Sequence, residues 1–183
     1  TPTEFYGDKW LAAKPSYVTD LDGFQPATAL AREPGHGRWR MLDYETDTLS
    51  GVMLMAGSET VAPEITFPLR VSGWHAISIG AWKIKDWYLN PGDSHELLVK
   101  LSDEQTFSMM SLPSLHAPTR PLVEWDRWTG GEELQERFWK VADLNGQELV
   151  LGQMAHKVAS GDGPGSLRCS PATIAYIKLV PLS

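Results

Sequence analysis

Short apolar or alternating runs dominate the chain from about Arg38 onward, and Gly, Pro, Ser or Asp residues separate them. Runs of this length without a helical repeat predict β-strands. The expected strands are Arg38–Tyr44, Gly51–Ala56, Glu64–Leu69, Trp74–Trp82, Glu96–Leu101, Phe107–Met110, Arg137–Asp143, Gln147–Gln153 and Thr173–Val180.

Two local patterns refine this picture. In Trp74–Gly80, small or polar residues interrupt large apolar ones, which predicts a buried, central strand. The pair Asn145-Gly146 lies between two apolar runs and predicts a tight hairpin turn, because both residue types tolerate positive φ. Helix signals are limited to single turns at Ser102–Gln105 and Gly131–Gln135, since Pro and Gly bracket every longer candidate.

Many short strands without a long helix predict an all-β fold, an antiparallel β-sandwich of the jelly-roll kind, and exclude a parallel α/β architecture. The 183 residues suit one sandwich domain spanning residues 1–183. The first 35 residues contain Pro15, Pro26 and Pro34 and show little periodicity, so we expect an extended N-terminal arm that crosses the sandwich surface and donates a short strand.

The charge balance limits the classes of binding partner that we expect. The chain has 16 basic and 23 acidic residues, a net charge of -7 and a pI of about 5.2, which argues against binding to nucleic acid or to an anionic membrane. No apolar run approaches the roughly 20 residues of a membrane span, and Thr1–Trp10 lacks the features of a signal peptide. Because the sequence does not begin with Met, we expect a mature form or an excised domain of a longer chain.

The eight tryptophans fall into two groups. Trp39, Trp74 and Trp139 lie inside expected strands, and we expect them to pack in the core because each buries a large area. Trp10 is expected to pin the N-terminal arm.

The other tryptophans lie in or beside two long connections, Lys83–His95 and Ser111–Leu134, and loops of this length in a compact domain are often functional. Sugar rings combine an apolar face with a rim of hydroxyls, so their sites combine aromatic platforms with polar side chains. Both connections have this mixture. The candidate ligand-binding residues are Trp82, Lys85, Asp86, Trp87, Tyr88, Trp125, Asp126, Arg127 and Trp128. The alternative is that these aromatic residues form small clusters that hold the loops down.

No local motif for catalysis or metal binding stands out. The five histidines show no metal-ligand spacing, and Cys169 is the single cysteine, so neither a catalytic residue nor a metal ligand is assigned. His75 is expected to be a hydrogen-bonded core histidine, whereas His95 and His116 lie at or near the aromatic loops.

Two acidic groups offer an alternative structural calcium site, although a solvated strand edge explains them as well. They are Asp43, Glu45 and Asp47, and Asp20 with Asp22.

Three segments resemble the galactose-binding-domain-like β-sandwiches, which occur as carbohydrate-binding or accessory domains of bacterial glycoside hydrolases. They are Pro63–Leu69, Val71–Ile77 and the closing Ile174–Leu179, and the resemblance covers Arg38 to the end. It implies sugar recognition through loops at one end of the sandwich. Many members hold a structural calcium, but this sequence lacks a clear calcium motif and has longer aromatic loops.

These features together predict a non-catalytic carbohydrate-binding module, secreted or extracellular if that function holds. Two alternatives stay open. One is a polysaccharide lyase or hydrolase whose site is assembled from distant residues. The other is a structural or assembly domain whose aromatic loops pack on other domains of a longer chain.

Overall fold

The computed structural model describes residues 14–33, 37–45, 48–57, 60–83, 95–112, 133–158 and 166–182. Within these ranges the chain is all-β, with fourteen strands, two short 3-10 helices and no α-helix. The 3-10 helices are η1 (Leu21–Gly23) and η2 (Ala27–Ala29). All strand pairs are antiparallel except β2 with β3.

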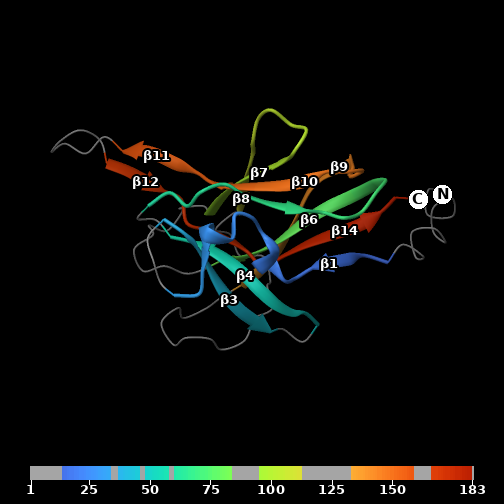
Figure 1. The fold of residues 1–183 in the computed structure, drawn as a ribbon, viewed down its shortest axis with the longest axis horizontal. Helices are drawn as coiled ribbons and strands as arrows, with labels where there is room; N and C mark the ends of the chain where they lie inside the picture. The colour runs from blue at the N-terminus through green and yellow to red at the C-terminus, as the bar shows by residue number, and fades with distance from the viewer. Residues whose placement is uncertain are drawn as a thin grey trace.

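Three four-stranded sheets and one hairpin make up the fold (Figure 1). The first, here called the β6 sheet, has the order β1 (Ser16–Val18), β14 (Tyr176–Pro181), β6 (Trp74–Lys83) and β9 (Glu133–Asp143). The β10 sheet has the order β5 (Ile65–Pro68), β10 (Glu148–Gln153), β7 (His95–Leu101) and β8 (Ser108–Leu112). The β4 sheet has the order β13 (Ala172–Ile174), β4 (Ser50–Ala56), β3 (Trp39–Glu45) and β2 (Leu30–Ala31). The hairpin pairs β11 (Ala155–Val158) with β12 (Ser166–Cys169).

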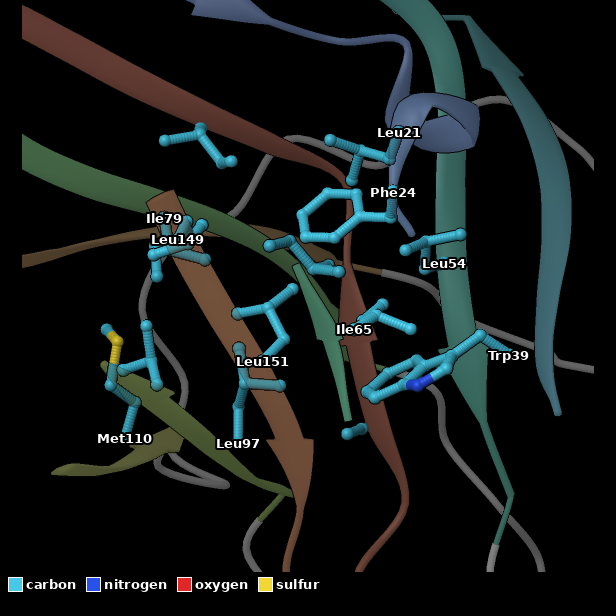
Figure 2. Packing of buried hydrophobic residues seen from close by; sticks show 14 of the residues in the cluster. Leu21, Phe24, Trp39, Leu54, Ile65, Ile79, Leu97, Met110, Leu149 and Leu151 are labelled. Atoms are coloured by element: carbon cyan, nitrogen blue, oxygen red, sulfur yellow. The ribbon is translucent and has the colours of Figure 1, made fainter. Parts of the chain in front are cut away.

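One hydrophobic cluster receives side chains from all three four-stranded sheets. Ile77 and Ile79 come from the β6 sheet, Leu151 from the β10 sheet, and Trp39 and Leu54 from the β4 sheet, and all five are almost completely buried. Figure 2 shows such side chains from different strands gathered in one place. Because apolar burial is the main favourable term in folding, this cluster is what holds the sheets together.

The segment that was expected to form an N-terminal arm contributes to this core. Leu21 of η1 and Phe24 are fully buried, and the Phe24 ring packs against Phe67 at 5.0 Å between ring centroids. β1 adds to the edge of the β6 sheet by pairing with β14.

The expected strands match the observed ones closely, and the expected central strand is confirmed because β6 lies between β14 and β9. Two expectations about individual elements are wrong. The run Thr173–Val180 is not one strand: it breaks at Ala175, with β13 in the β4 sheet and β14 in the β6 sheet. Glu133–Gln135 belongs to β9 and not to a helical turn.

The tight turn at Asn145-Gly146 is confirmed, but it does not close a hairpin. The amide of Gln147 donates to the carbonyl of Leu144, and Gly146 has φ +70. A two-residue hairpin turn of type I′ needs positive φ at both central residues, and Asn145 does not have it. Leu144 is fully buried in the shared cluster, so the chain crosses the core here and leaves the β6 sheet for the β10 sheet.

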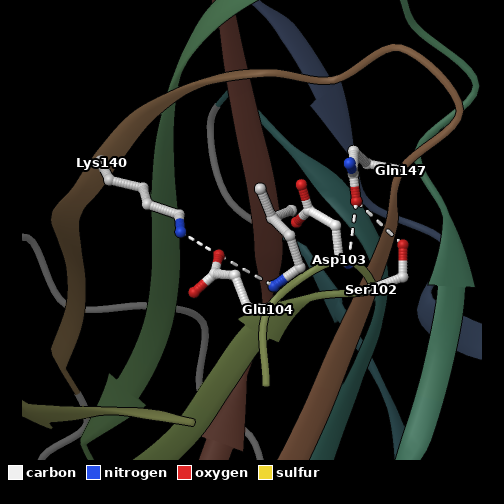
Figure 3. A network of polar contacts seen from close by, with 6 residues as sticks. Ser102, Asp103, Glu104, Lys140 and Gln147 are labelled. Atoms are coloured by element: carbon white, nitrogen blue, oxygen red, sulfur yellow. Dashed lines mark hydrogen bonds and ion pairs between the residues drawn. The ribbon is translucent and has the colours of Figure 1, made fainter. Parts of the chain in front are cut away.

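Polar contacts reinforce this crossing between the two sheets (Figure 3). Glu104, in the turn after β7, accepts a hydrogen bond from the Leu101 amide at 3.2 Å and pairs with Lys140 of β9. Nearby, the Ser102 hydroxyl and the Asp103 amide both donate to Gln147 Oε1. The turn after β7 is thereby attached to β9 and to the start of β10.

Candidate functional site

The nine candidate residues lie almost entirely outside the described part of the chain. Trp82 lies in β6, where its backbone pairs with Leu134 of β9. The others, which are Lys85, Asp86, Trp87, Tyr88, Trp125, Asp126, Arg127 and Trp128, lie outside the described residues.

The ends of the two aromatic connections are described, and they come together. Lys83, which precedes the first connection, pairs with Glu133, which follows the second. His95, which follows the first connection, pairs with Leu112, which precedes the second. All four ends are therefore cross-strand neighbours in two pairs.

One hydrogen bond links these two pairs across the sheets. The guanidinium of Arg137 in β9 donates to the carbonyl oxygen of Ser111, the residue before Leu112 in β8. Arg137 lies four residues after Glu133, roughly 13 Å along β9, and Ser111 is adjacent to Leu112 in β8. The described ends of the two connections therefore form one cross-strand pair in β6–β9 and one in β7–β8, and the Arg137–Ser111 hydrogen bond joins these two strand pairs.

A group of exposed apolar side chains was not predicted as a site. On the β6 sheet, Trp74 is 57% exposed, Phe138 59% and Val141 44%. The core expectation for Trp74 is wrong, whereas Trp39 is fully buried and Trp139 packs against the core as expected.

The register explains why Trp74 faces outward. Its neighbours Ile77 and Ile79 point into the shared core, and side chains alternate along a strand, so Trp74, Ala76 and Ser78 lie on the opposite face. His75 faces inward, is buried, and has Nδ1 2.9 Å from the Gly73 carbonyl, which confirms the expected core histidine.

Phe138 and Val141 of β9 share this outward face. Phe138 pairs with Ser78 and Val141 with Ala76, and they lie on one face despite their spacing because the register shifts between Ile77 and Ser78. We call five outward residues of this strand pair the β6–β9 platform: Trp74, Ala76, Ser78, Phe138 and Val141. Small side chains on β6 separate its larger ones.

Polar side chains border the platform toward the aromatic connections. The Tyr176 hydroxyl donates to Glu136 Oε1 at 2.9 Å, and Lys178 Nζ lies 3.3 Å from Glu136 Oε2. The Tyr176 ring crosses β6 directly over Gly80, where a Cβ atom would lie 2.2 Å from it. Burial, followed by the hydrogen bond to Glu136, raises the pKa of Tyr176 well above its usual value, so the hydroxyl stays a proton donor.

Neither a group of metal ligands nor a reactive cysteine stands out among the described residues. Among them no three His, Cys, Asp or Glu side chains gather as metal ligands; Asp43 is paired with Arg32 at 3.0 Å, and Asp47 lies outside the described ranges. Burial raises the pKa of the Cys169 thiol, which disfavours the reactive thiolate. None of the described segments is an apolar helix of the length that crossing a membrane requires.

Comparison with known proteins leaves the family open: no protein-family model matches the chain, and the search of curated proteins returns no significant match.

Proposed function

We propose that this chain is a non-catalytic carbohydrate-binding module whose sheets form a sandwich of the jelly-roll, galactose-binding-like kind. The observation that carries the proposal is that the four ends of the two aromatic connections pair with one another, Lys83 with Glu133 and His95 with Leu112. This pairing supports a single binding site, because eight of the nine candidate sugar-binding residues belong to the two connections and Trp82 lies just before the first.

The chemistry of these segments suits a polyhydroxylated ligand. Trp87, Tyr88, Trp125 and Trp128 offer aromatic faces for sugar C–H groups. Lys85, Asp86, Asp126 and Arg127 supply both hydrogen-bond donors and acceptors for hydroxyls.

Affinity electrophoresis through gels containing neutral and acidic polysaccharides tests the proposal. The wild-type chain should be retarded by at least one polysaccharide, and Trp87→Ala and Trp128→Ala should each weaken that retardation. Val61→Ala is the control, because Val61 is an exposed apolar residue on the segment before β5. Full retardation of both tryptophan variants would remove the loops from the site, and no retardation of the wild type by any glycan would refute the function.

A second candidate is an assembly domain, favoured by the exposed apolar side chains of Phe138 and Val141. Contiguous exposed apolar surface often marks a contact between proteins. Sedimentation velocity of the isolated chain distinguishes the two: a concentration-dependent dimer that Phe138→Ser dissociates would support assembly, and a monomer at all concentrations would oppose self-assembly.

A further inference from the structure

The turn between β9 and β10 is held at both ends, whereas its tip is exposed. Leu144, before the tip, is fully buried, and its amide donates to the carbonyl of Gly73 at 3.0 Å. Gln147, after the tip, donates to the carbonyl of Leu144, and its side chain belongs to the polar network of Figure 3. Asn145 and Gly146 between them are exposed, and a Cβ atom on Gly146 would meet nothing within 4 Å.

The peptide unit that joins Asn145 to Gly146 can rotate. Within the part of the chain that the structure describes, neither the carbonyl oxygen of Asn145 nor the amide of Gly146 has a hydrogen-bond partner. The Asn145 side-chain amide has none there either, and the backbone amide of Asn145 donates to Asp143 Oδ1 at 3.2 Å. Because glycine tolerates many backbone conformations, this unit can rotate without strain at Gly146 and without breaking a described hydrogen bond.

This freedom permits a reaction between the two neighbours. The backbone nitrogen of Gly146 can approach Asn145 Cγ, and glycine has no side chain to obstruct the approach. The N–Cγ bond that forms closes a succinimide ring, and the side-chain amide nitrogen leaves as ammonia with the proton of the Gly146 amide. Water then opens the ring at either carbonyl, which gives aspartate or isoaspartate. The two steps consume water alone and transfer no electrons.

We propose that Asn145 is a site of spontaneous deamidation in the folded protein, and that its isoaspartyl product weakens the passage from β9 to β10. In isoaspartate the backbone runs through the former side chain, so the turn gains one methylene group. The hydrogen bond from Gln147 to Leu144, at 3.2 Å, spans this lengthened segment. The new carboxylate also lies near Asp143, in a chain with a net charge of -7, and like charges repel. The reaction does not depend on carbohydrate binding.

Two other dipeptides of the chain each lack one requirement and serve as internal controls. Asn90 precedes Pro91, whose nitrogen carries no hydrogen to lose, so this route to the ring is closed. Asp22 precedes Gly23, but this pair lies in η1, and a Cβ atom on Gly23 would lie 2.8 Å from the Phe67 ring. We therefore expect neither dipeptide to form isoaspartate in the folded protein.

The first test incubates the full chain in mildly alkaline buffer and follows peptide maps by mass spectrometry. The peptide with Asn145 should gain the mass difference between an amide and an acid, and an isoaspartyl-specific methyltransferase should label it. Peptides with Asn90 and Asp22 should stay unlabelled. The folded chain should react within roughly tenfold of the rate in urea, since a misaligned attack costs about a hundredfold. If Asn145 reacts in urea and stays unchanged in the folded chain, the turn blocks the attack and the proposal is overturned.

Urea denaturation measures the consequence for the fold. Wild type in which most of Asn145 has reacted should unfold at a lower urea concentration than fresh wild type. Asn145→Ser should not change with incubation, because it has no side-chain amide to lose. Fresh Asn145→Asp carries the new carboxylate without the extra methylene group and should fall between fresh and reacted wild type. An unchanged midpoint in the reacted wild type, or an equal loss in incubated Asn145→Ser, would overturn the weakening of the passage.

Discussion

At the scale of single residues, Gly80 leaves the space that the Tyr176 ring needs to reach Glu136 at the border of the platform. Its position beneath the Tyr176 ring leaves no room for a Cβ atom, and the ring can reach Glu136 only by crossing this glycine. Gly80→Ala should therefore lower the free energy of unfolding by roughly 1–3 kcal/mol, because the buried ring must shift and its hydrogen bond weakens. Urea denaturation measures the change.

Gly152 in β10 is the matched control for that substitution. A Cβ atom there would meet Leu98 and Phe107 at 3.5 Å, which is an ordinary van der Waals contact. Gly152→Ala should change stability by less than about 1 kcal/mol. Equal losses in the two variants would show that the Tyr176 crossing is not what requires Gly80.

Tyr44 gives a second prediction at this scale. Its side chain is buried, and its hydroxyl has no hydrogen-bond partner within the part of the chain that the structure describes. Burial, followed by the negative charge of Asp20, raises its pKa to about 12. The folded state therefore keeps a proton on Tyr44 that the unfolded state releases near pH 10. Below about pH 10 both states hold this proton and the free energy of unfolding is unaffected by its titration; as the pH rises from about 10 toward 12, the free energy of unfolding falls.

Tyr44→Phe should leave stability at neutral pH unchanged or raise it by up to about 1 kcal/mol, since it removes a buried hydroxyl without a partner. It should also reduce the decline in unfolding free energy above pH 10. Guanidinium denaturation at about pH 8, 10 and 11 measures both effects, with Tyr17→Phe as the control because Tyr17 is exposed. A clear loss of stability at pH 8 in Tyr44→Phe would mean that the hydroxyl has a partner.

At the scale of elements, the contact between Glu104 and Lys140 joins the turn after β7 to β9, two parts of different sheets (Figure 3). Both side chains are about 70% buried, and Glu104 also accepts a backbone hydrogen bond. A double-mutant cycle with Glu104→Ala and Lys140→Ala should give a coupling energy of about 1 kcal/mol. The exposed pair Arg32–Asp43 is the control and should give less than about 0.5 kcal/mol. Equal couplings would argue that the contact between the sheets is no stronger than a surface ion pair.

At the scale of elements, the sequence was sufficient to locate most of the strands but not to assign them to sheets. Strand positions were predictable because alternation and turn residues are local signals, and even the turn at Asn145-Gly146 was located correctly. Sheet membership was not, because it depends on which distant strand offers a partner. At Leu144 and Ala175 the buried chain passes from one sheet to another. Leucine and alanine are common inside strands, so neither residue type predicts that a strand ends there.

The candidate site was predictable to a similar extent. Composition alone identified the two aromatic connections, whereas the pairing of their ends emerged only from the structure. Trp74 was assigned to the core because it lies inside an expected strand and a tryptophan side chain buries a large area. The inward positions of this strand are Ile77 and Ile79, so Trp74 lies on the opposite face. How exposed a side chain on that face is depends on which elements pack against it, and this cannot be deduced from the local sequence.

At the scale of the whole molecule, the shared hydrophobic cluster makes the three four-stranded sheets dependent on one another. Leu54 of the β4 sheet and Leu151 of the β10 sheet are both fully buried in it (Figure 2). Removing either side chain leaves a cavity that faces more than one sheet. We therefore expect the described sheets to unfold together in a single transition, as one domain does.

Leu54→Ala and Leu151→Ala test this cooperativity. Each should lower the free energy of unfolding by about 2–5 kcal/mol and shift one common transition, seen at the same denaturant concentration by tryptophan fluorescence and far-UV circular dichroism. Met109→Ala is the control, because its side chain is 51% exposed and its loss should cost well under about 1 kcal/mol. Separate transitions in Leu54→Ala would show that the β4 sheet folds as its own unit, because a cluster that truly joins the sheets cannot lose one of them while the others stay folded.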